Sequence, residues 1–388
     1  MKKGWETKSL GELCRLLSGQ HIEAKDYNAE GRGIGYLTGP SDFGPLHPVV
    51  TKWTEHPKVM AANGDILITV KGSGVGKINL LDQDEVAISR QLMAVRVTNA
   101  NSRFVHAFLS SAFDHFQSLS TGAAIPGISR DQVLGLEIAV PPLAEQQRIV
   151  GVLDEAFACL ATAQANAEKN LQNARALFES HLQSVFTHRG KGWEQKRIPD
   201  VCITFGRGKS RHRPRNEPSL YGGDYPFIQT GDLSNADHVI TTYTQTYSAK
   251  GLAQSKLWPK GTVGIAIVGA TIGETGILGF DGCFPDSIIG MNVDPKKADP
   301  FFIEYMLQHF KETVKSQGEG SARENINLAT FDRLVFPIPP IVDQHLIVKK
   351  FDLIKKETQR LESLYQQKQA ALSALKKSLL HQAFSGEL

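Results

Sequence analysis

The sequence predicts an α+β protein made of two related repeats, each a mixed α/β domain followed by one long helix. Two observations support the repeats: short sequences recur at a nearly constant offset, and a double proline stands at the same place in each copy. A third observation supports the helices. The segment after each double proline has a helical apolar period and contains no further proline.

The repeat is visible as matched residues along the chain. Gly4-Trp5-Glu6 recurs as Gly192-Trp193-Glu194, 188 positions later. From residue 104 onward the offset is 198 without a gap, so that Gln146 matches Gln344. Such a long ungapped series indicates two copies of one unit. The predicted parts are a first globular domain (1–140), a first long helix (141–188), a second globular domain (189–338) and a second long helix (339–388).

Short apolar runs broken by glycine predict the strands of each globular domain. Residues 66–70, 86–88 and 95–97 form such runs in the first copy, and residues 263–268 form one in the second. Each run is too short to establish a long helix. Together they predict a mixed α/β domain in front of each double proline.

The two predicted helices each carry an apolar stripe. In the first copy the stripe consists of Ile149, Leu153, Ala156, Leu160, Ala163, Ala167, Leu171, Ala174, Phe178 and Leu182. In the second copy two interleaved series recur every seven residues: Ile347, Phe351, Ile354, Thr358, Leu361, Tyr365, Lys368, Leu372, Leu375 and Leu379. Pairing the two helices as an antiparallel coiled coil, about a pseudo-twofold axis, buries both stripes. Burial against another chain is the alternative.

Composition limits the class of protein. The chain has 43 basic and 40 acidic side chains, a net charge of +3, so nucleic acid would have to be bound by local patches. Apolar runs are short, which predicts no membrane span, and the start of the chain lacks a signal peptide's apolar stretch, which predicts a cytoplasmic protein. The four cysteines form no CxxC pair, and no metal or cofactor is expected.

Motifs for catalysis fail at identifiable residues. The glycine-rich segment 71–77 resembles a phosphate loop, but Ile78 follows its lysine and Glu274 replaces Lys77 in the second copy. A structural turn is therefore expected, although its backbone amides could still hold a DNA phosphate. The double prolines follow Val140 and Ile338, so the adenine-methylase motif is absent. No catalytic residue is predicted.

A strip of alternating cations is the main candidate for DNA contact. Side chains at alternate positions of an extended segment point the same way, and like charges repel unless an anion lies opposite. A solvated loop is the alternative. The strip consists of Arg207, Lys209, Arg211, Arg213 and Arg215.

Further candidates lie in both copies. Arg90 and Gln91 suit guanine and adenine edges, and Ser89-Arg90-Gln91 aligns near Asp286-Ser287-Ile288 of the second copy. The other predicted DNA contacts are Lys71, Ser73, Lys77, Gln229 and Thr230.

Several segments together resemble the DNA specificity subunit of type I restriction-modification systems. They are the Gly-Trp-Glu-x-Lys openings at Gly4 and Gly192, the turn Asn63-Gly64-Asp65-Ile66-Leu67, the double-proline segments 141–150 and 339–344, and the ending 380–388. The resemblance covers essentially the whole chain. In segment 339–344 and just after it, Asp343 and His345 replace Glu145 and Gln147 of the first copy.

The resemblance implies two target recognition domains that read the halves of a bipartite site in double-stranded DNA. It also implies that the helices act as a spacer and dock two methyltransferase subunits, which methylate adenine, and that translocase-nuclease subunits join in the full complex. This chain would be non-catalytic. The alternatives are a DNA-modifying enzyme with its own unrecognised site and a coiled-coil scaffold with no role on DNA.

Overall fold

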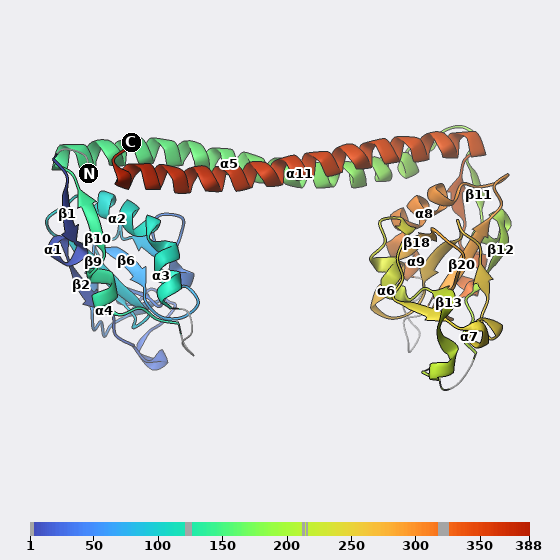
Figure 1. The fold of residues 1–388 in the computed structure, drawn as a ribbon, viewed down its shortest axis with the longest axis horizontal. Coiled ribbons are helices and arrows are strands. Elements are labelled where there is room, and N and C mark those ends of the chain that lie inside the picture. Colours follow the sequence, from blue (N-terminus) through green and yellow to red (C-terminus); the bar gives the residue numbers. More distant parts are fainter. Residues whose placement is uncertain (1–3, 121–125, 212–213, 215, 317–325) are drawn as a thin grey trace. The chain divides into compact units, whose positions relative to one another are not determined.

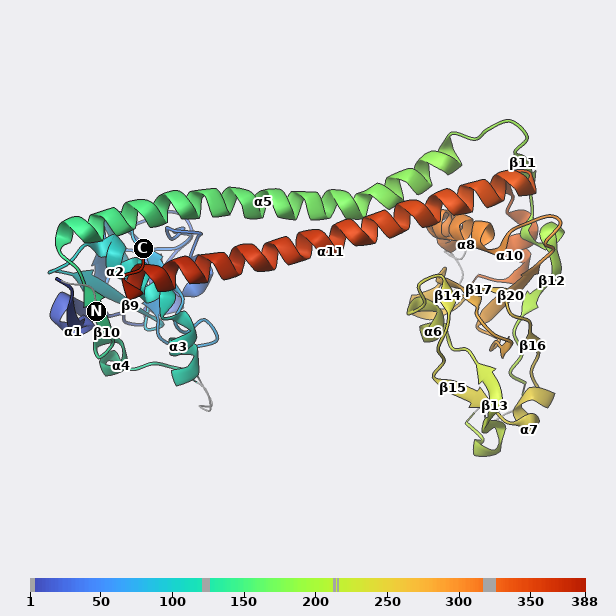
Figure 2. The same cartoon turned by 45° about the horizontal axis from the view of Figure 1, so that its top comes forward.

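The computed structural model describes residues 4–120, 126–211, 214, 216–316 and 326–388 (Figure 1). The chain divides into two compact units. Unit 1 consists of Met1–Lys169 with Gln366–Leu388, and unit 2 consists of Asn170–Tyr365. Each unit therefore contains one globular part together with a portion of each of the two longest helices (Figure 2).

The globular part of unit 1 is built on two four-stranded sheets. The first is antiparallel, in the order β2 (Cys14–Ser18), β9 (Leu92–Val97), β6 (Ile66–Thr69), β7 (Ile78–Leu80). The second has the order β4 (Trp53–Thr54), β3 (Ile34–Leu37), β8 (Glu85–Ile88), β5 (Met60–Ala62), with β3 and β8 parallel. A separate ribbon pairs β1 (Glu6–Ser9) with β10 (Glu137–Val140). The helices are α1 (Leu10–Leu13), η1 (Ala24–Asp26), η2 (Pro40–Asp42), α2 (Ser102–Ser111), α3 (Phe113–Leu119), α4 (Arg130–Leu134) and the start of α5 (Leu143–Thr187).

Unit 2 repeats this topology with one added strand. Its first sheet has the order β12 (Cys202–Arg207), β20 (Ile288–Val293), β17 (Val263–Ala266), β18 (Thr275–Leu278), β14 (Val239–Ile240). Its second sheet has the order β15 (Gln245–Tyr247), β13 (Tyr221–Phe227), β19 (Gly282–Cys283), β16 (Leu257–Trp258), and β11 (Glu194–Lys196) pairs with β21 (Phe336–Ile338). The helices are η3 (Ile198–Val201), η4 (Pro218–Leu220), α6 (Thr230–Ser234), α7 (Ala249–Ala253), η5 (Gly269–Thr271), α8 (Pro300–His309), α9 (Lys311–Ser316), α10 (Leu328–Arg333) and most of α11 (Ile341–Ser385).

Equivalent residues make equivalent contacts in the two units. In unit 1 the ring of Phe104 on α2 lies 5.2 Å from that of Phe384 near the end of α11. In unit 2 the ring of Phe302 on α8 lies 5.7 Å from that of Phe186 at the end of α5. Each globular core thus receives the end of the long helix that belongs to the other repeat, and apolar burial holds the helix there.

Segments of α5 and α11 also contact one another within each unit. In unit 1, Gln369 donates a hydrogen bond of 2.7 Å to Glu168, and the ammonium of Lys376 lies over the ring of Phe157. In unit 2, Arg175 forms an ion pair of 3.5 Å with Glu362. Within each unit, the farther along α5 a residue lies, the nearer to the start of α11 is the residue that it contacts.

The predicted stripes agree with burial except near the end of α11. All ten stripe residues of α5 are buried or half-buried, as are eight of the ten in α11. Lys368 is exposed. Leu375 is 48% exposed, so the predicted place of Leu375 in the seam is wrong. An ideal helix drifts by about 20° per heptad from a strict seven-residue repeat, and Leu375 lies four heptads after Ile347. Leu380 and Ala383 are buried there in its place.

Among the helices in the described residues, none combines the length with the apolar character that crossing a membrane requires.

Candidate nucleic-acid interface

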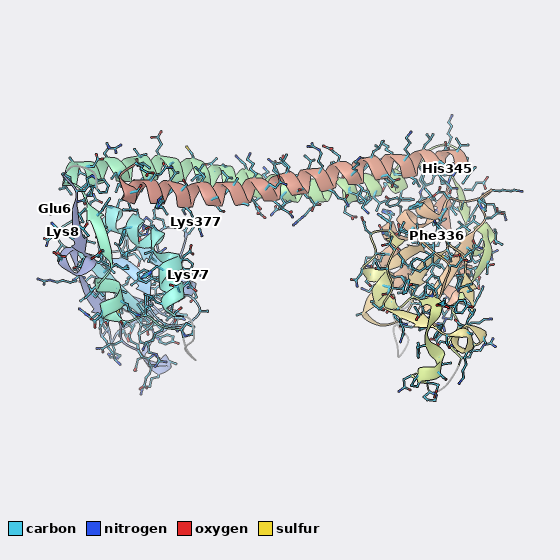
Figure 3. All side chains as sticks on the ribbon, in the orientation of Figure 1. Glu6, Lys8, Lys77, Phe336, His345 and Lys377 are labelled. Carbon is cyan, nitrogen blue, oxygen red and sulfur yellow. The ribbon has the colours of Figure 1, made fainter. Side chains whose placement is uncertain are left out.

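The glycine-rich segment 71–77 is a tight turn whose backbone is mostly occupied. Gly72 and Gly76 have φ values of 91° and 81°, and their equivalents Gly269 and Gly273 have φ values of 71° and 85°. Positive φ values of this kind favour glycine at all four positions. Four amides of the turn donate to carbonyl oxygens of the protein itself: Gly72 to Pro126, Val75 to Gly72, Gly76 to Thr69 and Lys77 to Gly74. These four amides are therefore not available to a phosphate. The side chains of Lys71, Ser73 and Lys77 are exposed (Lys77 is labelled in Figure 3).

Arg90 and Gln91 lie beside this turn, in the connection between β8 and β9. The carbonyl of Gln91 accepts a hydrogen bond of 2.8 Å from the amide of Val70, next to the turn. A Cβ atom on Gly39 would come within 2.3 Å of the Gln91 side-chain oxygen, and one on Gly74 within 2.7 Å of Pro40. Because both positions are glycine, the three loops 38–42, 71–77 and 89–91 can approach closely. We call them the first loop cluster.

The first loop cluster brings together all five DNA-contact candidates predicted in the first copy. Arg90 and Gln91 are exposed, as are the three candidates of the glycine turn. The loop 38–42 was not predicted. The second copy points to it, because equivalent bonds occur in both: Asp42 accepts from the amide of Gly39 at 3.4 Å, and Asp232 accepts from the amide of Gln229 at 2.7 Å.

In unit 2 this equivalence places Gln229 and Thr230 at the corresponding loop. Gln229 precedes α6, which contacts η5, the turn equivalent to the one that follows Lys71. Both side chains are half-buried, and the Gln229 amide donates to the side-chain oxygen of Gln245 at 3.2 Å. The two residues predicted from the sequence thus lie at the place in the second copy that matches loop 38–42 of the first.

The hydrogen bonds correct the predicted alignment by one residue. The carbonyl of Ser287 accepts from the amide of Ile267 as that of Gln91 accepts from Val70. Gln91 therefore corresponds to Ser287, and Arg90 corresponds to Asp286. A cation in one copy is replaced by an acid in the other, so the two surfaces have different electrostatic character at this place.

The cationic strip begins where β12 ends. Arg207 is the last residue of this strand, and the amide of Lys209 then donates to the carbonyl of Phe284 at 3.0 Å. In the first copy the amide of Gln20 makes the same bond to Ile88. The side chains of Arg207, Lys209 and Arg211 are exposed. Arg213 and Arg215 lie outside the described residues.

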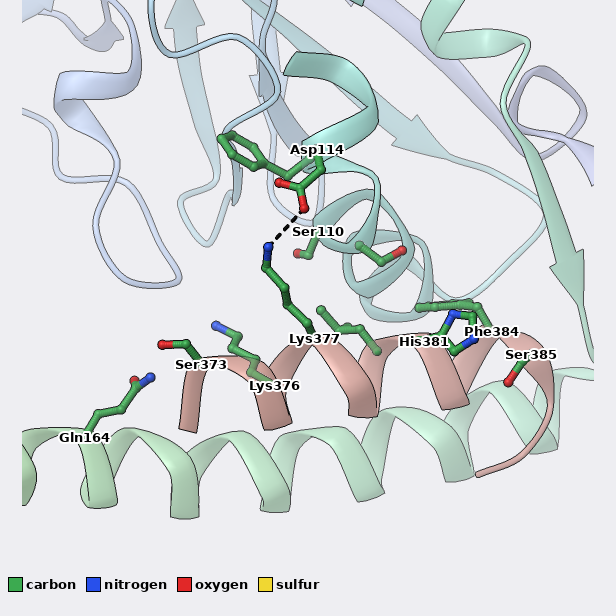
Figure 4. Close-up of a pocket in the computed structure, with 12 residues that line it drawn as sticks. Ser110, Asp114, Gln164, Ser373, Lys376, Lys377, His381, Phe384 and Ser385 are labelled. Carbon is green, nitrogen blue, oxygen red and sulfur yellow. Dashed lines mark hydrogen bonds and ion pairs between the residues drawn. The ribbon is translucent and has the colours of Figure 1, made fainter. Parts of the chain in front are cut away.

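A cavity of about 770 Å³ in unit 1 lies between α2, α3 and the two long helices (Figure 4). Phe113, Leu380 and Phe384 supply apolar walls, and Asp114, the one carboxylate among its lining residues, forms an ion pair of 3.0 Å with Lys377. This lining contains no carboxylate pair for acid–base chemistry. Within the described ranges, no group of three His, Cys, Asp or Glu side chains is arranged to hold a metal ion.

Comparison with known proteins relates both repeats to one family. Residues 2–172 and 190–370 each match the type I restriction modification DNA specificity domain. The putative type I restriction enzyme MjaX specificity subunit of Methanocaldococcus jannaschii is 30% identical over 149 residues, 37% of this chain and 35% of that protein. The type I restriction enzyme EcoDI specificity subunit of Escherichia coli is 20% identical over 99% of this chain and 88% of that protein.

Solved structures share the fold along the whole chain. A chain from a type I R-M system, solved in a study of complex assembly and conformational transition, superimposes with a TM-score of 0.78 at 21% identity and covers 100% of this chain and 99% of its own. The HsdS subunit from Thermoanaerobacter tengcongensis superimposes with a TM-score of 0.68 at 20% identity, covering 100% and 98%. At these identities the likeness concerns the fold.

Proposed function

The chain belongs to the type I restriction modification DNA specificity family, and from this premise we propose that each of its globular parts reads one half of an interrupted site in double-stranded DNA. Family membership confirms the class predicted from the sequence, a specificity subunit and not an enzyme with its own active site. The recognition domains would be residues 1–140 and 189–338.

One observation carries the proposal: two copies of one frame present different side chains at the same place. Arg90 stands where the second copy has Asp286, and Gln20 stands where it has Lys209. Base edges are distinguished by such donors and acceptors, whereas phosphate contacts mainly position a protein on the duplex. Two unlike surfaces on one frame suit a site whose halves differ in sequence. A coiled-coil scaffold with no role on DNA would not need this difference.

The long helices are proposed to be the spacer, paired as an antiparallel coiled coil. The contacts of Glu168 with Gln369 and of Arg175 with Glu362 support this pairing. Each helix has 45 residues, which corresponds to roughly 68 Å at 1.5 Å per residue. On this proposal the bases between the two half-sites are spanned and not read.

An exposed apolar stripe on α11 supports the docking of partner subunits. It lies in unit 2 and consists of Val342, Leu346 and Leu353, which are 61–66% exposed. The steps between them are 4 and 7 residues, which keeps them within roughly 40° of one helix face. An exposed apolar surface of this kind marks an interaction site. We propose that two methyltransferase subunits dock on the long helices, with translocase-nuclease subunits joining in the full complex.

Methylation sequencing tests this function. Cells that carry the gene should contain methylated adenine within one asymmetric, interrupted sequence, and cells without it should lack that modification. In the test tube, the purified chain should transfer no methyl group from S-adenosylmethionine until the modification subunit is added. Methyl transfer by the pure chain alone would instead support the alternative, an enzyme with its own site.

A further inference from the structure

Unit 2 holds four cations together without acidic partners. Several basic side chains of this unit are paired, for example Arg197 with Asp200, Lys311 with Glu274 and Lys355 with Asp237. Among the described basic residues that form no ion pair, four lie on two segments that are hydrogen-bonded to each other: Arg207, Lys209, Arg211 and Lys256. The first three belong to the cationic strip. Lys256 lies 47 residues beyond Lys209 in sequence and was not predicted.

Lys256 is held in place by an aromatic ring. Its ammonium lies 3.6 Å from the centre of the Trp258 ring, a geometry in which the ring face attracts a cation. Trp258 itself is fully buried on β16. A Cβ atom on Gly290 would come within 2.8 Å of this ring, so the glycine allows the ring to lie against β20. Since the ring is fixed by packing, the position of the charge is restricted as well.

Two hydrogen bonds tie the segment before Lys256 to the strip. The hydroxyl of Ser255 donates to the carbonyl of Lys209 at 2.8 Å, and the amide of Arg211 donates to the side-chain oxygen of Gln254. The first copy has an equivalent tie, in which the ammonium of Lys58 donates to the carbonyl of His21 at 2.8 Å. In both copies, the segment before the edge strand (β16 or β5) is therefore hydrogen-bonded to the corresponding loop, which contains Lys209 or His21.

The fold therefore brings like charges together. Burial lowers the pKa of Lys256 from its ordinary value, and the charge of Lys209 lowers it further. In the free protein, both effects disfavour the charged form of the Lys256 side chain. An anion placed opposite Lys209 and Lys256 would favour that charged form instead. A DNA phosphate is such an anion, and the strip is already the proposed DNA-contact surface of this domain.

We propose that Lys256 contacts a backbone phosphate of the half-site that the second domain reads, and that Trp258 is the residue that positions it. This inference rests on the proposed function. It adds to the strip a contact from the residue just before β16, so that DNA would be held from two places: β12 with its following loop, and the segment that leads into β16. Because phosphates carry no sequence information, the contact would contribute affinity and register and not base selectivity.

The test is a salt titration of DNA binding by the chain assembled with its modification subunits. Each phosphate contact contributes about 0.9 to the slope of log affinity against log salt. Lys256→Ala should reduce the slope by about 0.9, and Lys256→Arg should restore it. The ratio of affinities for matched and single-mismatch duplexes should stay within about twofold of the wild type.

Lys296→Ala is the matched control. This exposed lysine follows the end of β20 that pairs with Cys202, whereas the strip adjoins the other end of the strand. The slope of log affinity against log salt for Lys296→Ala should equal that of the wild type. An unchanged slope in Lys256→Ala, beside a wild-type complex that binds its site with normal salt dependence, would overturn the inference alone. A wild-type complex that binds no site selectively would overturn the proposed function.

A second variant tests the positioning role of Trp258. Trp258→Phe weakens the attraction of the ring for the ammonium while keeping an aromatic side chain in the core. It should lower the salt slope in the wild-type background and have no effect in the Lys256→Ala background. An equal effect in both backgrounds would show that the ring acts only through packing.

Discussion

Gln146 and Gln344 secure the starts of the two long helices by two hydrogen bonds that both repeats share. The side-chain oxygen of Gln146 accepts a hydrogen bond of 2.8 Å from the backbone amide of Asn101. That of Gln344 accepts one of 2.8 Å from the backbone amide of Asp299. The side-chain nitrogen of each glutamine donates a hydrogen bond of 2.8 Å to the carbonyl of the first proline in its double proline, Pro141 or Pro339. Both side chains are buried, at 3% and 0% exposed. Each long helix is thereby joined to the capping residue of the neighbouring helix α2 or α8.

Gln146→Ala should therefore destabilise unit 1. The change leaves a buried amide and a buried carbonyl without their partner, which costs about 1–3 kcal/mol in free energy of unfolding. Urea denaturation measures this loss. Gln147→Ala, at the exposed neighbouring position, should change stability by less than about 0.5 kcal/mol. Equal stability of the two variants would contradict the structural role of Gln146.

Lys209→Ala combined with Arg211→Ala should weaken DNA binding by the assembled complex in a salt-dependent way. Loss of two phosphate contacts would flatten the slope of log affinity against log salt by up to about 2. Selectivity for the half-site read by the first domain should not change. As a control, Lys191→Ala with Lys296→Ala removes two exposed cations outside the strip. A normal slope in the first variant would indicate that the strip is a solvated loop.

Lengthening the helix pair should widen the gap in the DNA site. Seven residues added to each helix, where Glu168 meets Gln369, preserve the heptad phase and add roughly 10 Å. At roughly 3.4 Å per base pair, the gap should grow by about three base pairs while both half-sites keep their sequence. Methylation sequencing gives the new site. An active variant with the original gap would show that the helices do not set the distance.

Leu346→Glu with Leu353→Glu should prevent the modification subunit from binding. Both leucines are 61% exposed, so charges there leave the folded chain intact while disrupting an apolar interface. Co-purification with the modification subunit is the measurement, and circular dichroism checks the fold. Gln366→Glu introduces a charge on another face of α11, where the side chain is also exposed, and should co-purify normally.

Stability should fall in mild acid because of His106. Burial, aided by Arg103, His47 and Lys376, lowers the pKa of His106 from 6.5 to about 4. Between these values the unfolded chain binds the proton and the folded chain does not, so stability is full above pH 6.5 and decreases toward pH 4. The loss is up to about 3 kcal/mol. Unfolding at pH 7.5 and pH 5 should show a smaller difference in His106→Gln than in the wild type, while exposed His115→Gln should behave as the wild type.

The sequence alone was sufficient for the parts of the molecule that depend on local pattern. The sequence repeat aligns Gly72 and Gly76 with Gly269 and Gly273, and all four glycines have positive φ. The double prolines and the apolar period predicted two long helices, which begin at Leu143 and Ile341. Helix formation and tight turns depend on neighbours a few residues apart, so their signals are present in short stretches of sequence.

The tertiary structure decided which distant segments meet. The loop 38–42 joins Arg90 and Gln91 because glycines at 39 and 74 allow three loops to approach, which no single stretch of sequence reveals. Lys256 lies beside the strip because sheet pairing places β16 next to β19, whose neighbouring carbonyl at Phe284 binds the amide of Lys209. Such contacts follow from the path of the whole chain. The direction of each side chain on the proposed DNA-contact surface therefore depends on packing far from it in sequence.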